Sequence, residues 1–250
     1  MANDSSPPCT WAVVPAAGSG SRMGHAIQKQ YLKIASKTIL QHTLEHLITS
    51  SLTNIVVTVA PTDEKWREMP LADHGKLTFV EGGDSRAASV LNGLQVVTAH
   101  QEKDCWVMVH DAVRPCVRNR DIENLIESVV DHSVGGLLAT RTNDTLKKAR
   151  LPSDSTTNEA DRTVIEVERT VDRERYWCAL TPQIFRLGML HEAITRAIES
   201  DANVTDEASA VELLGLTPLL IEGSSDNIKV THPEDLKLAE FYMSMQESEP

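Results

Sequence analysis

Cysteine is scarce in this chain of 250 residues, and no two cysteines stand in a C-x-x-C pattern. The four are Cys9, Cys105, Cys116 and Cys178. Such scattered positions argue against a disulfide scaffold, and free thiols are expected in an intracellular chain of this length. The nine histidines form no H-E-x-x-H or comparable ligand spacing, which argues against a structural zinc site.

Long apolar runs are also missing. No stretch approaches the roughly 20 consecutive apolar residues of a membrane-spanning helix. The first ten residues, MANDSSPPCT, have neither the basic and apolar regions of a secretory signal nor the arginines of an organellar transit peptide. We therefore expect no membrane partner and a cytoplasmic location.

Basic residues are outnumbered: 24 Lys and Arg stand against 36 Asp and Glu, which gives a formal net charge of -12. General nucleic-acid binding depends on Lys and Arg that neutralise phosphates, so this balance argues against a nucleic-acid partner. It does not exclude a small phosphorylated ligand, because a few converging cations can hold one. With 41% hydrophobic residues, the chain has the composition of a globular protein with a sizeable core.

Short β-branched runs alternate with longer helical patterns over the first 142 residues. The expected strands are Trp11–Pro15, Ile55–Ala60, Leu77–Glu81, Cys105–His110 and Gly135–Thr142. The expected helices are Ile39–Thr49, Thr62–Met69, Ser85–Ala99 and Asp121–His132. Near-continuous apolar strands separated by helices indicate an α/β fold, with a mostly parallel twisted sheet and helices on both faces.

This alternation stops after Thr142. Residues 143–175 are polar and too many for a plain connection inside a compact domain. Within them, Thr163–Val167 alternates like a strand, which favours an extended β-arm over a structureless loop. Regular patterns resume with helices at Leu187–Ser200 and Asp206–Leu214, and strands at Leu219–Glu222 and Asn227–Val230. We expect a single domain, residues 1–250, with an arm at about 143–175.

The strongest local signal is the glycine-rich segment AAGSGSRMG, residues 16–24, directly after the first expected strand. Glycines lack a Cβ atom, so the backbone N–H groups can approach a phosphate closely. The segment is not a Walker A loop, and its G-x-G-x-x-x-G spacing is one residue off the dinucleotide fingerprint. The end of the second expected strand also lacks the acidic residue that binds an NAD ribose. An NAD(P)-binding oxidoreductase remains the alternative of a different class, although Arg22 and Lys29 favour a triphosphate.

This loop, followed by K-Q-Y-L at Lys29, resembles the opening of the sugar-phosphate nucleotidyltransferases. Further blocks follow in order: GGDSR at Gly82, HDAVRP at His110, DTLK at Asp144, TVDR at Thr170, LTPQ at Leu180, TDEAS at Thr205 and DNIKV at Asp226. Together they resemble the 2-C-methyl-D-erythritol 4-phosphate cytidylyltransferase family over residues 12 to about 242. The ribitol-5-phosphate cytidylyltransferases share the loop and the D-A-x-R-P block and remain an alternative, but the A-A-G and T-D-E-A-S blocks favour the methylerythritol family.

The resemblance implies a Rossmann-like nucleotidyltransferase fold and transfer of CMP from CTP to methylerythritol phosphate, with release of pyrophosphate, in non-mevalonate isoprenoid biosynthesis. It implies Arg22 and Lys29 as transition-state stabilisers, and Arg173 and Lys229 as residues that position the acceptor phosphate. The other nucleotide-binding residues that it implies are Ala16, Ala17, Gly18, Gly20, Gly83, Asp84, Arg86, Ser89 and Ala112. The other acceptor-binding residues that it implies are Asp111, Arg114, Thr145 and Thr205.

Asp111 is also a candidate from its position alone, because it follows the fourth expected strand and open α/β sheets bind ligands at the carboxyl ends of their strands. A carboxylate there suits Mg²⁺, which takes few carboxylates together with substrate phosphates. We therefore expect Mg²⁺ as cofactor with Asp111 as its ligand, and a helix N-cap is the structural alternative. Asp84 and Thr205 have the same alternative, as caps of the helices that follow them.

The arm carries an expectation about assembly. In the resembled family, the arm interlocks with a second subunit and reaches its active site. Thr145 and Arg173 flank the irregular segment, so the resemblance implies a homodimer formed through the arm.

Overall fold

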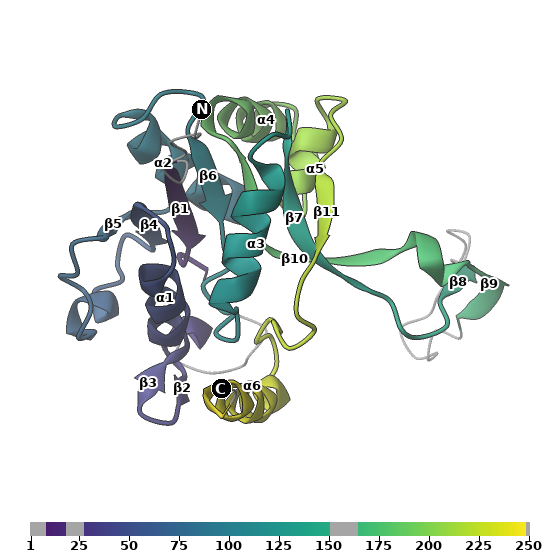
Figure 1. Ribbon diagram of the computed structural model, residues 1–250, viewed down its shortest axis with the longest axis horizontal. Helices are drawn as coiled ribbons and strands as arrows, with labels where there is room; N and C mark the ends of the chain where they lie inside the picture. Colours follow the sequence, from purple (N-terminus) through teal and green to yellow (C-terminus); the bar gives the residue numbers. More distant parts are fainter. Residues whose placement is uncertain (1–8, 19–27, 151–164, 249–250) are drawn as a thin grey trace, which may run out of the picture.

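A seven-stranded sheet forms the centre of the molecule (Figure 1), with the strand order β11-β7-β10-β6-β1-β4-β5. The computed structural model describes residues 9–18, 28–150 and 165–248. The strands of the sheet are β1 (Thr10–Pro15), β4 (Asn54–Val59), β5 (Leu77–Glu81), β6 (Trp106–Val109), β7 (Gly135–Arg141), β10 (Trp177–Arg186) and β11 (Leu219–Glu222). Neighbours pair in parallel except at β10, which runs antiparallel to β6 and β7. The predicted mostly parallel α/β fold is confirmed.

Helices cover both faces of this sheet. One face carries α1 (Ile39–Thr49) and α3 (Asn119–Val129), and the other carries α2 (Arg86–Thr98), α4 (Leu187–Glu199) and α5 (Glu207–Glu212). Alternation along β1 explains the arrangement: Val14 joins the core beneath α1 and α3, whereas Val13 joins the core beneath α2 and α4. A continuous apolar strand is therefore buried on both sides.

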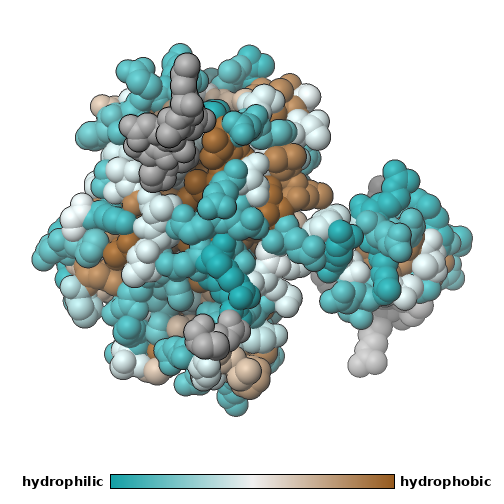
Figure 2. Space-filling model, viewed as in Figure 1, coloured by the Kyte–Doolittle hydropathy of each residue, from teal (hydrophilic) through white to brown (hydrophobic). Residues whose placement is uncertain are grey.

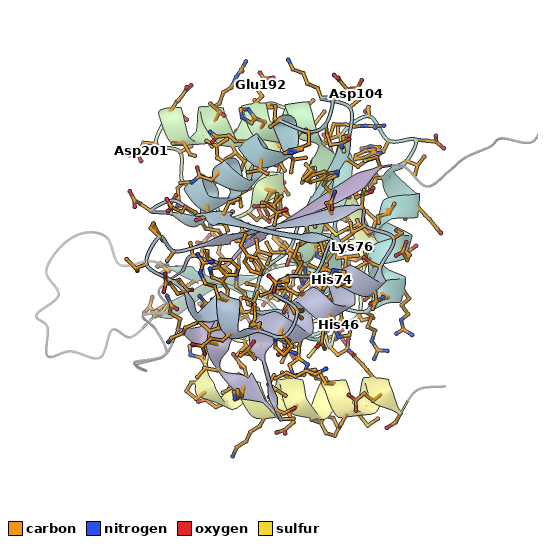
Figure 3. All side chains as sticks on the ribbon, turned by 90° about the vertical axis from the view of Figure 1, so that its left-hand side faces the viewer. His46, His74, Lys76, Asp104, Glu192 and Asp201 are labelled. Carbon is orange, nitrogen blue, oxygen red and sulfur yellow. The ribbon has the colours of Figure 1, made fainter. Side chains whose placement is uncertain are left out.

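A third, smaller core lies against the C-terminal helix α6 (Pro233–Glu247). This helix packs on the short hairpin of β2 (Lys33–Ile34) and β3 (Lys37–Thr38). In the side view of Figure 3, α6 crosses below α1, whose His46 is labelled, and α4 with Glu192 lies at the opposite end. Just before α6, the N–H of Val230 donates to the carbonyl of Val113 at 2.9 Å. This bond fixes the segment that precedes α6 beside the loop that follows β6.

The arm is a two-stranded antiparallel ribbon of β8 (Lys147–Arg150) and β9 (Glu166–Thr170). It projects away from the sheet as a separate lobe on a narrow neck (Figures 1 and 2). Every residue of both strands is exposed, and the cross-strand ion pairs are exposed as well. Exposed ion pairs of this kind contribute about 0–1 kcal/mol each to stability. Because every strand residue is exposed, the two described strands of the arm have no buried core between them.

Local structure differs from the sequence-based expectation at several segments. The helix expected over Thr62–Met69 is a short 3₁₀ turn, η3 (Lys65–Glu68), which buries none of its residues. No strand forms at Asn227–Val230. The strand expected at Thr163–Val167 lies further along the chain, at β9, and residues 163–164 lie outside the described residues. Finally, β10 was not expected, because Pro182 interrupts its pattern, and its pairing with β7 shifts register there.

Two further short 3₁₀ helices, η2 (Lys29–Tyr31) and η4 (Arg173–Arg175), carry predicted site residues. Among the described residues, none of the helices has the length and apolar character needed to cross a membrane.

Candidate functional site

A cavity of about 150 Å³ opens where β1 and β6 end. The chain leaves β1 toward β4 on one side of the sheet and later returns to place β6 on the other side. Adjacent strands with diverging connections form a topological switch point, where open α/β sheets bind ligands. The residues that line the cavity are Pro15, Ala16, Ala17, Gly18, Lys29, Gln30, Arg86, Ser89, Asp111, Ala112, Val113 and Lys229.

Most of the predicted nucleotide residues, together with Asp111 and Lys229, are therefore brought to one place. Gly20 and Arg22 lie outside the described residues. Thr145 and Arg173 have exposed side chains at the base of the arm and do not line the cavity of their own chain, and Arg173 donates to the carbonyl of Asn143.

Gln30 was not predicted, yet it anchors the loop that follows β1. Its side chain is buried, and its Nε2 donates to the carbonyl of Ala16 at 2.8 Å. The bond ties η2, which carries Lys29, to the loop that leaves β1. The K-Q-Y-L block contained this residue, but nothing in its spacing indicated that the glutamine holds the loop.

The second glycine-rich segment packs directly on the first. A Cβ atom at Gly82 would lie 2.5 Å from the Cβ of Ala17, so only glycine permits this approach. The hydroxyl of Ser89 accepts from the N–H of Gly83 at 3.1 Å and also contacts its carbonyl at 3.2 Å. Gly83 is thus held beside the cavity through Ser89, although Gly83 does not itself line it.

The capping alternatives for two candidates are wrong. Ser85, and not Asp84, caps α2 by accepting from the N–H of Ala88. Asp206, and not Thr205, caps α5. In both cases the cap lies one residue further along, because only that side chain reaches the N–H three positions ahead. Asp84 and Thr205 are exposed, so neither is occupied by a capping role.

Asp111 is the electrostatic centre of the cavity. Its Oδ1 accepts from Nε and Nη2 of Arg86 at 3.2 and 3.1 Å. Its Oδ2 lies 2.8 Å from Nζ of Lys229 and 3.5 Å from Nε of Arg114. Burial alone would raise the pKa of this carboxyl, but the positive charges of Arg86, Lys229 and Arg114 outweigh burial and lower the pKa well below its usual range. The carboxylate is therefore ionised throughout the neutral pH range.

A buried polar chain supports Asp111 from behind. The N–H of Asp111 donates to Oγ1 of Thr181 at 3.0 Å, and the same oxygen lies 3.2 Å from Nδ1 of His110. His110 is fully buried, and burial lowers its pKa to about 3. The imidazole is therefore neutral near pH 7, so it orients the loop without adding charge to the site.

The same chain reaches the segment before α6. Asn227 donates from Nδ2 to the carbonyl of Thr181 at 2.9 Å, and Arg114 donates from Nη1 to the carbonyl of Asn227 at 2.7 Å. His110, Thr181 and Asn227 were not predicted as functional residues, although each lies inside a recognised block. Only the folded arrangement shows that these blocks meet.

The metal assignment to Asp111 finds little support in this geometry. Among the residues that the structure describes, no three His, Cys, Asp or Glu side chains are grouped to hold a metal ion. Asp111 is the one acidic residue among the described residues that line the cavity, and cationic side chains engage both of its oxygens. A metal ion bound there would have to displace at least one of these ion pairs.

Comparison with known proteins agrees with the site. The family model of 2-C-methyl-D-erythritol 4-phosphate cytidylyltransferase (IspD) matches residues 10–245. The enzyme of that name from Vibrio vulnificus is 46% identical over 236 residues, which cover 94% of each chain. The Salmonella newport enzyme is 45% identical over 234 residues, which cover 93% of each chain. The solved structure of the Francisella tularensis enzyme superposes with a TM-score of 0.76 at 35% identity, over 94% of this chain and 99% of that one.

These matches extend over nearly the whole chain, and they agree with the motif order and with the cavity at the switch point. The resemblance found in the sequence motifs is confirmed, and so is the Rossmann-like nucleotidyltransferase fold. The chain therefore belongs to the 2-C-methyl-D-erythritol 4-phosphate cytidylyltransferase family of nucleotidyltransferase enzymes.

Proposed function

We propose that this chain transfers CMP from CTP to 2-C-methyl-D-erythritol 4-phosphate, forming 4-diphosphocytidyl-2-C-methyl-D-erythritol and pyrophosphate in non-mevalonate isoprenoid biosynthesis. The observation that carries the proposal is the cavity at the switch point, where Lys29, Arg86 and Lys229 lie around Asp111. Three cations and one carboxylate leave an excess of positive charge in an otherwise acidic protein. Such a local excess suits two phosphorylated substrates.

The nucleotide is proposed to occupy the side of the cavity formed by the loop after β1. Ala16, Ala17 and Gly18 line this side, and their backbone can approach a phosphate closely. The bond between Gly83 and Ser89 holds the loop that follows β5, and this loop would bind the cytidine. Asp84, in the same loop, and Ala112, in the cavity lining, would also contact the nucleotide. The α-phosphate oxygens carry negative charge in the transition state, as the acceptor oxygen attacks phosphorus and pyrophosphate leaves, and Lys29, with Arg22, would stabilise that charge.

The acceptor is proposed to occupy the side that holds Asp111 and Lys229. The ionised carboxylate of Asp111 can accept hydrogen bonds from the hydroxyls of a polyol. Lys229 offers a compact positive charge to the phosphate, while Arg114 lies behind Asp111. Thr205, exposed just before α5, would extend this side. The site then acts chiefly by alignment and by charge stabilisation, which are what a phosphoryl-type transfer requires.

Mg²⁺ is proposed to bind with the nucleotide and not on a preformed protein site. Asp111 is already engaged by Arg86, Arg114 and Lys229, so it is poorly suited as the main ligand. Mg²⁺ commonly keeps substrate phosphates and waters as ligands. When bound, the ion would neutralise part of the charge of the triphosphate.

A homodimer is proposed because the described residues of the arm leave apolar side chains exposed. Its described residues include the exposed apolar side chains Ile165, Val167 and Tyr176. Thr145 and Arg173, at the base of the arm, would then serve the acceptor side of the partner's cavity.

The chain is proposed to act as a single catalytic domain in the cytoplasm. All four cysteines are free thiols, two exposed and two buried. Free thiols are typical of reducing compartments.

One assay tests the proposed function. Purified protein is incubated with Mg²⁺, CTP and methylerythritol phosphate, and pyrophosphate release is followed together with the nucleotide product by mass spectrometry. The wild-type chain should release pyrophosphate only when both substrates are present. Absence of release with every acceptor would contradict a transferase function.

A matched pair of lysine variants makes the assay specific for the cavity. Lys29→Ala removes a lining cation and should lower kcat by about 10²-fold or more, because it acts where charge develops. Lys33→Ala removes an exposed lysine outside the cavity, four residues further along the chain, and should leave kcat within about twofold. Equal effects of both changes would contradict the role given to Lys29.

Ribitol 5-phosphate as acceptor is tested in the same assay. The family match and the T-D-E-A-S block favour methylerythritol phosphate. A higher kcat/KM with ribitol phosphate would reverse that assignment while leaving the transferase chemistry in place.

A further inference from the structure

Glu207 carries a fully buried carboxylate, which is unusual for a glutamate. It is the first residue of α5, within the T-D-E-A-S block, and its side chain is completely inaccessible to solvent. Glutamate is almost never fully buried unless it is paired. Asp206 is half-buried and Thr205 is exposed, so among the three residues at the start of this block only Glu207 is fully buried.

The partner of Glu207 is Arg86, the first residue of α2. Nη1 and Nη2 of Arg86 donate to the two oxygens of Glu207 at 2.6 and 3.1 Å, in a bidentate arrangement. The same guanidinium donates from Nε and Nη2 to Asp111. Arg86 is thus held between two carboxylates that come from different parts of the chain, while it still lines the cavity.

The attachment of α5 to the rest of the protein includes other contacts besides this ion pair. Gln183 of β10 accepts from the N–H of Ala208 and donates to Asp206, both at 2.8 Å. The capping box of Asp206 and Ser209 satisfies the start of the helix. Moreover, replacing a buried ion pair by apolar groups is often neutral or stabilising, so anchoring α5 does not explain why a charge is kept at Glu207.

The position of Arg86 has direct consequences for Asp111. Three cations, Arg86, Arg114 and Lys229, share this single carboxylate. Glu207 binds two nitrogens of Arg86 and so limits how far the guanidinium can turn toward Asp111. Without Glu207, Arg86 would pair more closely with Asp111 or move outward, since about a third of its side chain is already accessible.

We propose that Glu207 is a positioning residue, which fixes the Arg86 guanidinium between the nucleotide side and the acceptor side of the cavity. It touches neither substrate and acts only through Arg86. The inference rests on the proposed function, because the two sides are defined by the two substrates. From the sequence motifs alone, Glu207 is only a residue at the start of a helix.

A double-mutant cycle tests the inference. Glu207→Gln keeps the size of the side chain but removes its charge and one acceptor oxygen. It should lower kcat/KM for the acceptor by about tenfold or more while the protein remains folded by circular dichroism. Arg86→Met removes the guanidinium. If Glu207 acts only through Arg86, adding Glu207→Gln to Arg86→Met should change kcat/KM by less than about threefold.

A control separates positioning from simple loosening of α5. Val211→Ala removes buried apolar volume from the same helix without touching Arg86. It should lower the unfolding midpoint at least as much as Glu207→Gln does, yet keep kcat/KM within about twofold. If Val211→Ala lowers kcat/KM as much as Glu207→Gln, the loss reflects helix stability and the inference is wrong.

The outcome remains decidable when turnover is too slow to measure. The dissociation constant of CTP, measured by calorimetry for the same four proteins, gives a second cycle. If Glu207→Gln lowers kcat/KM, or weakens CTP binding, by the same factor in the wild-type and in the Arg86→Met background, the inference is overturned. Failure of the wild-type chain to release pyrophosphate would instead refute the proposed function, so the two failures are distinct.

Discussion

Nζ of Lys229 lies 2.8 Å from Oδ2 of Asp111, although one residue precedes α6 and the other follows β6. One backbone and one side-chain hydrogen bond hold the two loops together: the N–H of Val230 donates to the carbonyl of Val113, and Nη1 of Arg114 donates to the carbonyl of Asn227. The ion pair is therefore set by how the loops are joined and not by attraction between two freely moving charges. Loss of Lys229 removes a charge from a loop that should otherwise keep its position.

Lys229→Ala should lower kcat/KM for the acceptor by about 10- to 100-fold, the expected effect of losing one charge-assisted hydrogen bond. KM for CTP should change less, because Lys229 lies on the proposed acceptor side of the cavity. Steady-state kinetics with each substrate varied in turn measures the split. Lys237→Ala, at an exposed position of α6, is the control and should behave like wild type. A loss confined to CTP binding would contradict the assignment.

Complementation between inactive chains tests the proposed dimer. Arg173→Ala and Asp111→Asn should each abolish most activity. In a mixed dimer, one cavity would combine an intact Asp111 with an intact Arg173 from the other chain. Random exchange of subunits should therefore restore about a quarter of the wild-type activity. No recovery after exchange, with dimers confirmed by sedimentation, would show that Arg173 does not serve the partner's cavity.

His110 should make the protein less stable in mild acid. Its pKa is about 3 in the folded chain because of burial, against about 6.5 in an unfolded chain. The unfolded state therefore binds the proton more tightly, and stability falls as pH drops from about 6.5 toward about 3, by up to about 1.4 kcal/mol per pH unit. Urea unfolding of wild type and His110→Gln at pH 5, 6 and 7 should show a steeper decline for wild type. Parallel profiles would refute this account.

Gly93 in α2 should tolerate no side chain. A Cβ atom there would lie 2.5 Å from Cγ1 of Val13, which is itself fully buried in β1. Gly93→Ala should therefore destabilise the protein by about 1–3 kcal/mol, even though alanine favours helix formation. Gly75→Ala adds a methyl group with no neighbour within 4 Å and should stay within about 0.5 kcal/mol of wild type. The free energies of unfolding of wild type, Gly93→Ala and Gly75→Ala, measured by chemical denaturation, show whether the steric clash outweighs the helix propensity of alanine.

The order of apolar and polar residues along the chain predicted those helices and strands whose structure is decided by neighbouring residues. The strand at β1 and the helix at α1 follow from continuous apolar residues and from helical periodicity. Local pattern failed at β10, where a proline interrupts the alternation and pairing with β6 and β7 decides the structure. It also failed at Asn227–Val230, where side-chain bonds from distant loops hold an extended segment without a strand.

In the candidate site, too, some residues could be predicted from the sequence and others could not. Lys29, Asp111 and Lys229 were predicted from motifs and proved to line one cavity. The residues that hold them, Gln30 and Thr181 among them, were missed because their role is a contact across the fold and not a property of their own type. A motif indicates which groups do the chemistry, and only the packed structure shows what keeps them in place.

The C-terminal helix gives the site an unexpected weakness. Ala239 is its one buried residue among those described, and Phe241 and Met245 are left exposed. An element with so little buried surface opens locally at a lower free-energy cost than the sheet. Lys229 lies just ahead of that helix, so an opening of α6 that spread to the bond between Val230 and Val113 would release a cation of the cavity lining while the sheet remained intact. Loss of function on warming would then begin at the end of the chain, well before the β-sheet melts.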